Sequence, residues 1–145
     1  MKNIFRSVLV IALLFSCCIA FGKEYYSVRS GEASDMLNWN SSRDGKGASP
    51  ATFNDVNDIF IIQGGHVLTG AFSCMGSLLL ERNTVYTSGK QNSLSSIGTI
   101  LTINEGAQVH LLNGSILTVG FVLIQGEIAN KGGEIRFHPA VAAKH

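Results

Sequence analysis

Residues 101–123 read LTINEGAQVHLLNGSILTVGFVL, and this stretch determines the fold class. Its odd-numbered positions are mostly apolar, namely Leu101, Ile103, Ala107, Val109, Leu111, Leu117, Val119, Phe121 and Leu123. The positions between them carry polar side chains such as Thr102, Gln108, His110 and Thr118. Apolar side chains at every second position indicate β-strands with one buried and one exposed side. Because the chain after residue 22 shows no helical repeat, the sequence predicts an all-β protein.

Glycine spacing then predicts how the strands are connected. Gly98, Gly106, Gly114, Gly120, Gly126 and Gly132 lie 8, 8, 6, 6 and 6 residues apart. Strands this short suit a chain that changes direction every few residues, since glycine accepts the positive φ that a corner often requires. Stacking such segments places each strand on the next and buries their apolar sides in one continuous core. We expect a short right-handed parallel β-helix, with an antiparallel meander or small sandwich as the alternative.

The expected β-helix occupies residues 58–138, enough for about four rungs of about 20 residues each. Residues 23–57 are polar and irregular and contain the only Trp, so they are predicted to form an N-terminal capping segment. Trp39 is expected to anchor this segment, since buried aromatic rings bury large areas; a sugar-stacking platform is the alternative. Residues 139–145 form a short C-terminal tail. An uncovered solenoid end exposes strand edges, so we expect self-association there or a fragment of a longer β-helix.

The first 22 residues have the pattern of a secretory signal peptide. Lys2 and Arg6 precede the apolar run 8–15 (VLVIALLF), and residues 20–22 (AFG) offer a cleavage site. This predicts a secreted or outer-surface protein. A periplasmic protein, or one lipid-anchored through Cys17, is the alternative because residues 14–17 (LFSC) loosely match a lipidation site. After cleavage at residue 22 only Cys74 would remain, and its apolar neighbourhood predicts a small buried hydrophobe.

Charge and motifs exclude several function classes. Eleven Lys and Arg against ten Asp and Glu leave a net charge of +1, with no basic cluster for nucleic acid. No second apolar run is long enough to span a membrane. No phosphate-binding loop, serine nucleophile elbow, HExxH or CxxC motif is present, and we expect no cofactor.

Two groups of polar residues are candidate sites. Glu105, Glu127 and the outward His110 could serve a carbohydrate site, because glycoside hydrolysis needs two carboxyl groups near each other. The alternative is that they are scattered charges that keep the surface soluble. Calcium prefers oxygen ligands, which makes the second group a candidate metal site, although Asn and Asp also shape turns before strands. This group comprises Asn54, Asp55, Asn57 and Asp58.

Several short segments resemble a known family. They are residues 25–31 (YYSVRSG), 38–40 (NWN), 54–62 (NDVNDIFII) and 64–69 (GGHVLT), followed by the strand motifs LTI at 101–103 and LTV at 117–119. Together they are similar to the N-terminal module of large secreted bacterial parallel β-helix surface proteins. The resemblance implies a parallel β-helix, an outer-surface location, type IX export and an adhesin-like role. The chain is shorter than those proteins and lacks their C-terminal sorting domain, and the family supplies no catalytic residue.

Two functions follow from these patterns. The first is a secreted or cell-surface module without enzymatic activity, with an adhesive or glycan-binding role and a surface glycan or protein as partner. The second is a complete or truncated carbohydrate-active β-helix of the polysaccharide lyase or hydrolase type.

Overall fold

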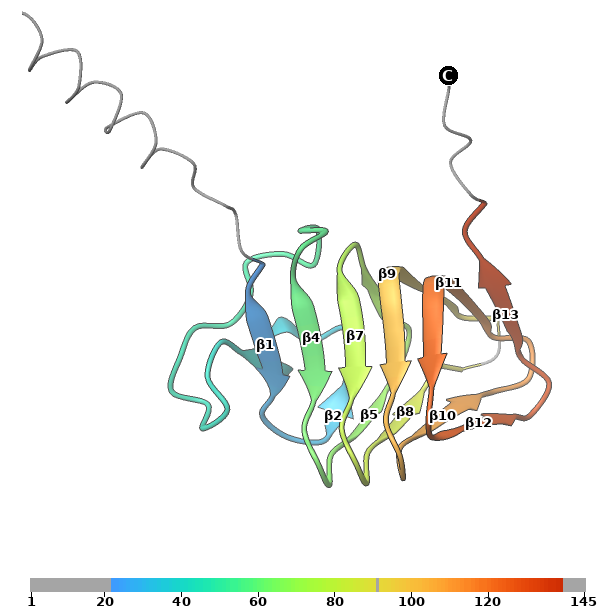
Figure 1. The fold of residues 1–145 in the computed structure, drawn as a ribbon, viewed down its shortest axis with the longest axis horizontal. Coiled ribbons are helices and arrows are strands. Elements are labelled where there is room, and N and C mark those ends of the chain that lie inside the picture. The colour runs from blue at the N-terminus through green and yellow to red at the C-terminus, as the bar shows by residue number, and fades with distance from the viewer. Residues whose placement is uncertain (1–21, 91, 140–145) are drawn as a thin grey trace, which may run out of the picture.

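The computed structural model describes residues 22–90 and 92–139, which fold into a parallel β-solenoid of about four turns (Figure 1). The larger sheet contains β1 (Glu24–Ser27), β3 (Trp39–Asn40), β4 (Ile59–Ile62), β6 (Ser73–Cys74), β7 (Ser77–Leu80), β9 (Leu94–Ile103), β11 (Ile116–Ile124) and β13 (Glu134–Phe137). The second sheet contains β2 (Gly31–Glu32), β5 (Val67–Thr69), β8 (Val85–Thr87), β10 (Gln108–Leu111) and β12 (Glu127–Asn130). One short 3-10 helix, η1 (Met36–Asn38), precedes β3.

Strand pairing divides the coil into three sides. The front side consists of β1, β4, β7, residues 100–103 of β9 and residues 121–124 of β11. The second side is the smaller sheet, and the third side consists of β6, residues 94–97 of β9, residues 116–119 of β11 and β13. All these pairs are parallel, and only β1 with β3 is antiparallel among the described strands. The predicted right-handed parallel β-helix is therefore confirmed, and the antiparallel alternative is wrong.

The core consists of apolar side chains stacked in register from rung to rung. Phe60 of β4 pairs with Leu78 of β7, which pairs with Leu101 of β9, and all three are at most 1% exposed. On the second side Leu68, Tyr86 and Val109 form an equivalent stack, each with no exposed surface. These stacks run along the solenoid axis, so every rung depends on its neighbours for burial of its apolar side.

Two of the nine expected core residues point outward. Phe121 and Leu123 are 57% and 48% exposed, although their odd numbers predicted an inward direction. The pairing of β11 with β9 shifts between Val119 and Phe121, where β11 turns the corner from the third side to the front side. Because a shift of one residue moves every following side chain to the opposite face, the alternation restarts with Val122 directed inward.

The predicted corner glycines fall into two classes. Gly106 and Gly114 have the expected positive φ of 76° and 72°. Gly98 and Gly120 do not have a positive φ, and lie instead where neighbouring rungs approach closely. A Cβ atom on Gly98 would stand 2.3 Å from the Met75 carbonyl oxygen, and one on Gly120 would stand 2.3 Å from the Thr99 carbonyl oxygen. These two positions require glycine for space.

The N-terminal end of the solenoid is closed. Trp39 has no exposed surface, stacks on Phe72 with ring centroids 5.5 Å apart, and meets Phe60 edge-on at 5.2 Å. Phe53, from the loop that follows β3, also contacts both phenylalanines. The predicted role of Trp39 as the anchor of the cap is confirmed. The boundary at residue 57 differs, because β1 and β2 already pair in parallel with β4 and β5 and form the first rung.

The C-terminal end is open. Residues 121–124 of β11, together with β12 and β13, each pair with a described strand on one side only. Their inward side chains are accordingly incompletely covered: Val122, Ile128 and Ile135 are partly buried, while Ile124 and Phe137 are 54% and 63% exposed. Among the residues that the structure describes, the solenoid thus carries a cap at one end and an uncovered apolar edge at the other.

The predicted signal peptide, the candidate anchor Cys17 and tail residues 140–145 lie outside the described residues. Within residues 22–90 and 92–139, no helix has the length and apolar character needed to cross a membrane.

Candidate functional site

The front side carries apolar side chains on its outer surface as well as on its inner surface. In register across the sheet, Ile59 of β4, Ile100 of β9 and Phe121 of β11 point outward along one row, with Ser77 between the first two. A second row contains Tyr26, Ile61, Leu79, Thr102 and Leu123. We call these ten outward positions, including Glu24 at the start of the first row, the front face.

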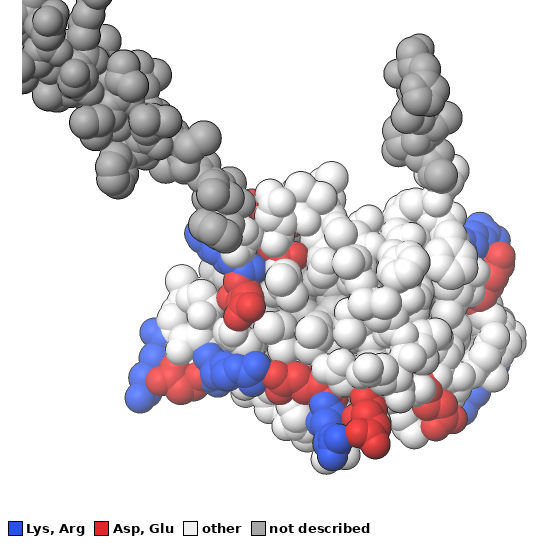
Figure 2. Space-filling model, in the orientation of Figure 1, with Lys and Arg blue, Asp and Glu red and all other residues white. Residues whose placement is uncertain are grey.

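Exposure of the front face increases toward the open end of the solenoid. Ile61 is only 6% exposed because Tyr26 and Leu79 flank it, and the Arg43 guanidinium lies 4.5 Å from the centre of the Tyr26 ring. Phe121 and Leu123, in contrast, are about half exposed. Figure 2 shows this face free of charge over β4, β7, β9 and β11, with charged groups gathered along its lower border. Apolar patches of this kind on a surface mark interaction sites.

The sequence contained a signal for this face that alternation alone could not reveal. Residues 59–62 (IFII) and 78–80 (LLL) are continuous apolar runs. A half-buried strand would alternate, whereas a strand that is apolar on both sides produces such a run. The alternation within residues 101–123 gave no reason to expect these outward residues to form a surface feature.

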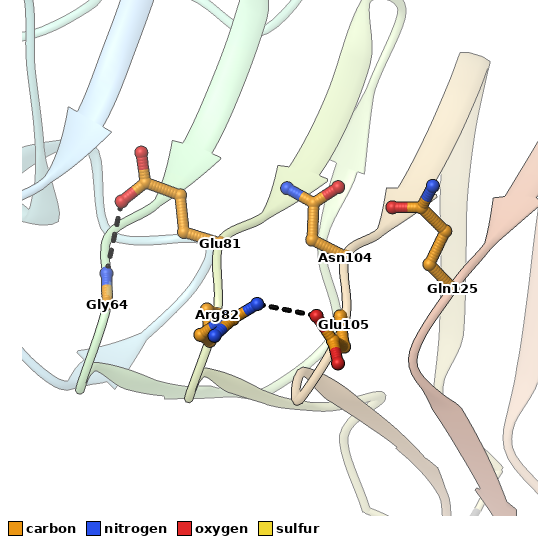
Figure 3. A pocket seen from close by; sticks show the side chains of 6 residues that line it. All are labelled: Gly64, Glu81, Arg82, Asn104, Glu105 and Gln125. Atoms are coloured by element: carbon orange, nitrogen blue, oxygen red, sulfur yellow. Dashed lines mark hydrogen bonds and ion pairs between the residues drawn. The ribbon is translucent and has the colours of Figure 1, made fainter.

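A polar groove borders the front face where its strands end (Figure 3). It follows the corner between the front and second sides and has a volume of about 550 Å³. Three successive rungs each supply one side chain at the same corner position: Glu81 after β7, Asn104 after β9 and Gln125 after β11. Gly64, Arg82 and Glu105 complete the lining of this groove, which we call the corner groove.

Ion pairs hold the carboxylates of the corner groove. Glu81 accepts hydrogen bonds from Arg43 and from the Gly64 backbone N–H, and the Arg43 contact lowers the pKa of the Glu81 carboxyl. Glu105 pairs with Arg82 from the preceding rung. The groove therefore presents amides and charge-compensated carboxylates, which suit a neutral ligand rich in hydroxyl groups better than an ion.

The residues predicted for a carbohydrate site lie on adjacent rungs but in different surroundings. Glu105 is in the corner groove, whereas Glu127 begins β12 and accepts a hydrogen bond from the Gln108 side chain at 3.2 Å. His110 points outward from β10 and contacts Gln108 at 3.1 Å. Gln108 thus connects Glu127 and His110, while Glu105 is separately paired with Arg82.

Trp39 has no ring face available to a ligand. It is completely buried between Phe60 and Phe72, and its indole N–H donates to the Ala33 carbonyl at 2.8 Å. A buried Trp with its polar group satisfied fulfils a packing role.

The four residues predicted as calcium ligands shape the approach to β4. The Asp55 carboxylate accepts the Asn57 backbone N–H at 2.9 Å, and the buried Asp58 carboxylate accepts the Lys23 backbone N–H at 2.9 Å. Asn54 is exposed at the start of the same turn. Over residues 22–90 and 92–139, no three His, Cys, Asp or Glu side chains are grouped in a way that could hold a metal ion.

Two potential nucleophiles, Cys74 and Ser27, are buried and have structural roles. Burial raises the pKa of the Cys74 thiol to about 12, which agrees with the predicted small hydrophobe. Ser27 is buried, accepts the Gln63 backbone N–H at 2.9 Å and lies 2.7 Å from His66 Nδ1. Since the serine oxygen is buried, this pair stabilises the corner that follows β1 and β4.

No family model, curated protein or solved structure matches this chain.

Proposed function

We propose that this protein is a secreted or cell-surface binding module without enzymatic activity, and that it adheres to neutral polysaccharide through the front face and the corner groove. The observation that carries the proposal is the uncharged apolar surface over four successive strands, bordered by a ladder of amide and carboxylate side chains. The predicted signal peptide supports a location where such polymers are present.

The chemistry of the two surfaces matches that of a sugar polymer. A pyranose ring has apolar C–H faces and a rim of hydroxyl groups, so it needs a flat apolar support and planar hydrogen-bonding partners beside it. Phe121 and Leu123 supply exposed apolar surface, and Asn104 and Gln125 supply both donors and acceptors. The rungs repeat every ~4.8 Å along the axis, which presents these groups to an extended chain at regular intervals.

The test is binding of the purified protein to a glycan array and to insoluble neutral polysaccharides in sedimentation assays. We expect retention on at least one neutral polymer, with little change on raising the salt concentration because the front face carries no charge over β4, β7, β9 and β11 (Figure 2). Absence of binding to every glycan tested would contradict the proposal.

A matched pair of variants locates the binding surface. Ile100→Glu places a charge in the middle of the front face, and Val85→Glu places the same charge on an outward, partly buried position of the second side. We expect the first to abolish retention and the second to leave it unchanged. Equal loss in both variants would show that binding does not use the front face.

Glu105 and Glu127 provide the test of the carbohydrate-active alternative. If incubation with a bound polymer releases shorter products, and Glu105→Gln or Glu127→Gln stops the release without reducing retention, the protein is an enzyme. The binding proposal expects no release of product from the unaltered protein.

Self-association through the open end is a further part of the proposed function. It follows from the unpaired edges of the last rung and the exposed apolar side chains within them.

A further inference from the structure

The open end presents backbone groups as well as apolar side chains. The backbone N–H groups of Glu127 and Lys131 donate to β10, at 3.0 and 2.8 Å from the Ala107 and Leu111 carbonyls. Backbone groups alternate in direction along a strand, so those of Ile128 and Asn130 point away from β10 toward the open side. In β13, the N–H groups of Glu134 and His138 likewise donate to the preceding rung, to the carbonyls of Ser115 and Val119. Those of Ile135 and Phe137 therefore point toward the open end.

The open end has three strand edges, namely residues 121–124 of β11, β12 and β13. They require a partner that also offers one strand edge on each of three sides. The capped N-terminal end of another copy cannot serve, because β3 and the loop with Phe53 cover it. The open end of a second copy offers a matching outline. The charges agree with this partner, since residues 121–138 contain two acidic and two basic side chains and are neutral overall: Glu127, Lys131, Glu134 and Arg136.

The rise of the chain along the last rung determines which symmetry axis can relate the two copies. Along the last rung the chain climbs steadily from residues 121–124 through β12 to β13, so the end of the solenoid is a staircase (Figure 1). A two-fold axis through the middle of β12, perpendicular to the solenoid axis, exchanges the front side with the third side. It places the low edge of one copy, residues 121–124, against the high edge β13 of the other. The gap between the two ends is then the same on all three sides.

Side-chain direction and charge select the register of β12 against its copy. Directly opposed residues of an antiparallel pair must point to the same side, which allows either Ile128 or Ala129 to lie opposite itself. The register centred on Ala129 also places Glu127 opposite Lys131 of the second copy. Opposite charges facing each other across strands are favourable, and the alternative register lacks this pair.

We propose that two copies of this chain associate through their open ends as a two-fold dimer, with β12 paired antiparallel to β12 and centred on Ala129. Residues 121–124 of each copy pair with β13 of the other, which brings Val122 and Ile124 against Ile135 and Phe137 of the second copy. The two solenoid cores become one continuous core, capped at both ends. The inference rests on the self-association part of the proposed function and is independent of polysaccharide binding.

Cross-linking tests the register. In the proposed pair Ala129 occupies the central position without hydrogen bonds to its opposite residue, where the Cβ atoms come closest and a disulfide can form. Protein carrying Ala129→Cys, produced from the full chain, should form a disulfide-linked dimer under mild oxidation. Thr87→Cys is the matched control, because Thr87 points outward in the same stack two strands from the edge. It should remain unlinked, as should the buried Cys74 of the unaltered protein.

Sedimentation equilibrium tests the surface. Phe137→Glu places a charge on an inward position of the edge, and we expect it to raise the dimer Kd by roughly tenfold or more, since burying a Phe is typically worth ~1.5–3 kcal/mol. Leu94→Glu changes an equally exposed apolar residue, 67% against 63%, that lies two strands from the edge. It should leave the dimer intact.

The outcomes separate this inference from the polysaccharide proposal. A protein that is monomeric at its highest soluble concentration overturns the dimer, and so does a dimer that Leu94→Glu weakens as much as Phe137→Glu. If Phe137→Glu fails to fold, the Ala129→Cys cross-link decides. Ile100→Glu should lose polysaccharide retention and stay dimeric, whereas Phe137→Glu should become monomeric and retain the polymer at high protein concentration.

Discussion

Trp39 shows how one residue closes the end of a solenoid. The first rung has only the two-residue strand β3 beyond it, so its apolar interior would face water unless side chains covered it. Trp39 contacts Phe60 and Phe72, and Phe53 packs on the same two rings from the loop beyond β3. Four aromatic rings from four segments therefore form one cluster that closes this end of the solenoid.

We expect Trp39→Ala to lower the free energy of unfolding by about 3–5 kcal/mol, the usual cost of removing a large buried aromatic side chain. Leu37→Ala is the control, because Leu37 is 70% exposed two residues away and should change stability little. Urea unfolding followed by circular dichroism measures both. Comparable small effects of the two variants would contradict the assigned role.

Cys74 and Tyr86 should make the protein sensitive to alkali. Burial raises the pKa of the Cys74 thiol from 9.0 to about 12, and that of the Tyr86 hydroxyl from 10.0 to about 12. Above pH 9 the unfolded chain loses the thiol proton while the native state retains it, so the unfolded state is favoured as pH rises. Stability is unaffected by these groups below pH 9 and falls between pH 9 and 12.

Urea midpoints measured from pH 8 to 11 test this dependence. Each buried group contributes at most about 1.4 kcal/mol per pH unit. Cys74→Ala should remove part of the slope that begins near pH 9 and leave the Tyr86 contribution above pH 10. An unchanged slope in Cys74→Ala would show that the thiol titrates normally in the folded protein.

At the scale of the strand and its corner, glycine has two separate uses. Gly65, Asn83 and Gly106 follow successive front-side strands, and all three have a positive φ, between 60° and 85°. The presence of Asn83 shows that this position tolerates the residue that most readily adopts a left-handed conformation after glycine. Gly98 and Gly120, by contrast, occupy a corner where a side chain would strike the backbone of the preceding rung.

Substitutions at these two kinds of corner should differ accordingly. Gly98→Ala forces neighbouring backbones apart, since its Cβ would lie 2.3 Å from the Met75 carbonyl oxygen, and we expect a loss of roughly 1–3 kcal/mol. Gly65→Asn should cost much less, because nothing lies within 4 Å of a Cβ there. Thermal unfolding of the two variants checks the difference. A larger loss in Gly65→Asn would contradict the assignment of Gly98 to close approach.

At the scale of the whole molecule, the sequence predicted what depends on local alternation. Leu101 to Val119 were placed correctly because their inward and outward residues follow a period of two. Phe121 and Leu123 were not, because the corner at Gly120 shifts the register and a corner leaves no mark in a hydrophobic pattern. The front face was not recognised for a related reason: it exists only when outward residues of strands up to 23 positions apart are placed side by side, as Leu79 and Thr102 are.

The asymmetry between the two ends should appear as a gradient of local stability. In a solenoid each rung contacts only its neighbours, so a closed end opens less often than an open one. The aromatic cluster supports β4 and the residues around Phe72, while the last rung is covered on one side only. We expect amide hydrogen exchange to be slowest in β4 and β7 and fastest in β12 and β13 of the monomeric Phe137→Glu variant.

Association of the open ends should reverse that gradient locally. In the unaltered protein at high concentration, the N–H groups of Ile128 and Asn130 gain partners in the second copy and should exchange more slowly than at low concentration. Those of Glu127 and Lys131 already donate to β10 and should be protected at both concentrations whenever the rung is folded. Exchange that slows by the same factor at all four positions would indicate tighter folding of the rung without strand pairing between copies. Protection confined to Ile128 and Asn130 follows only if β12 gains a strand on its open side.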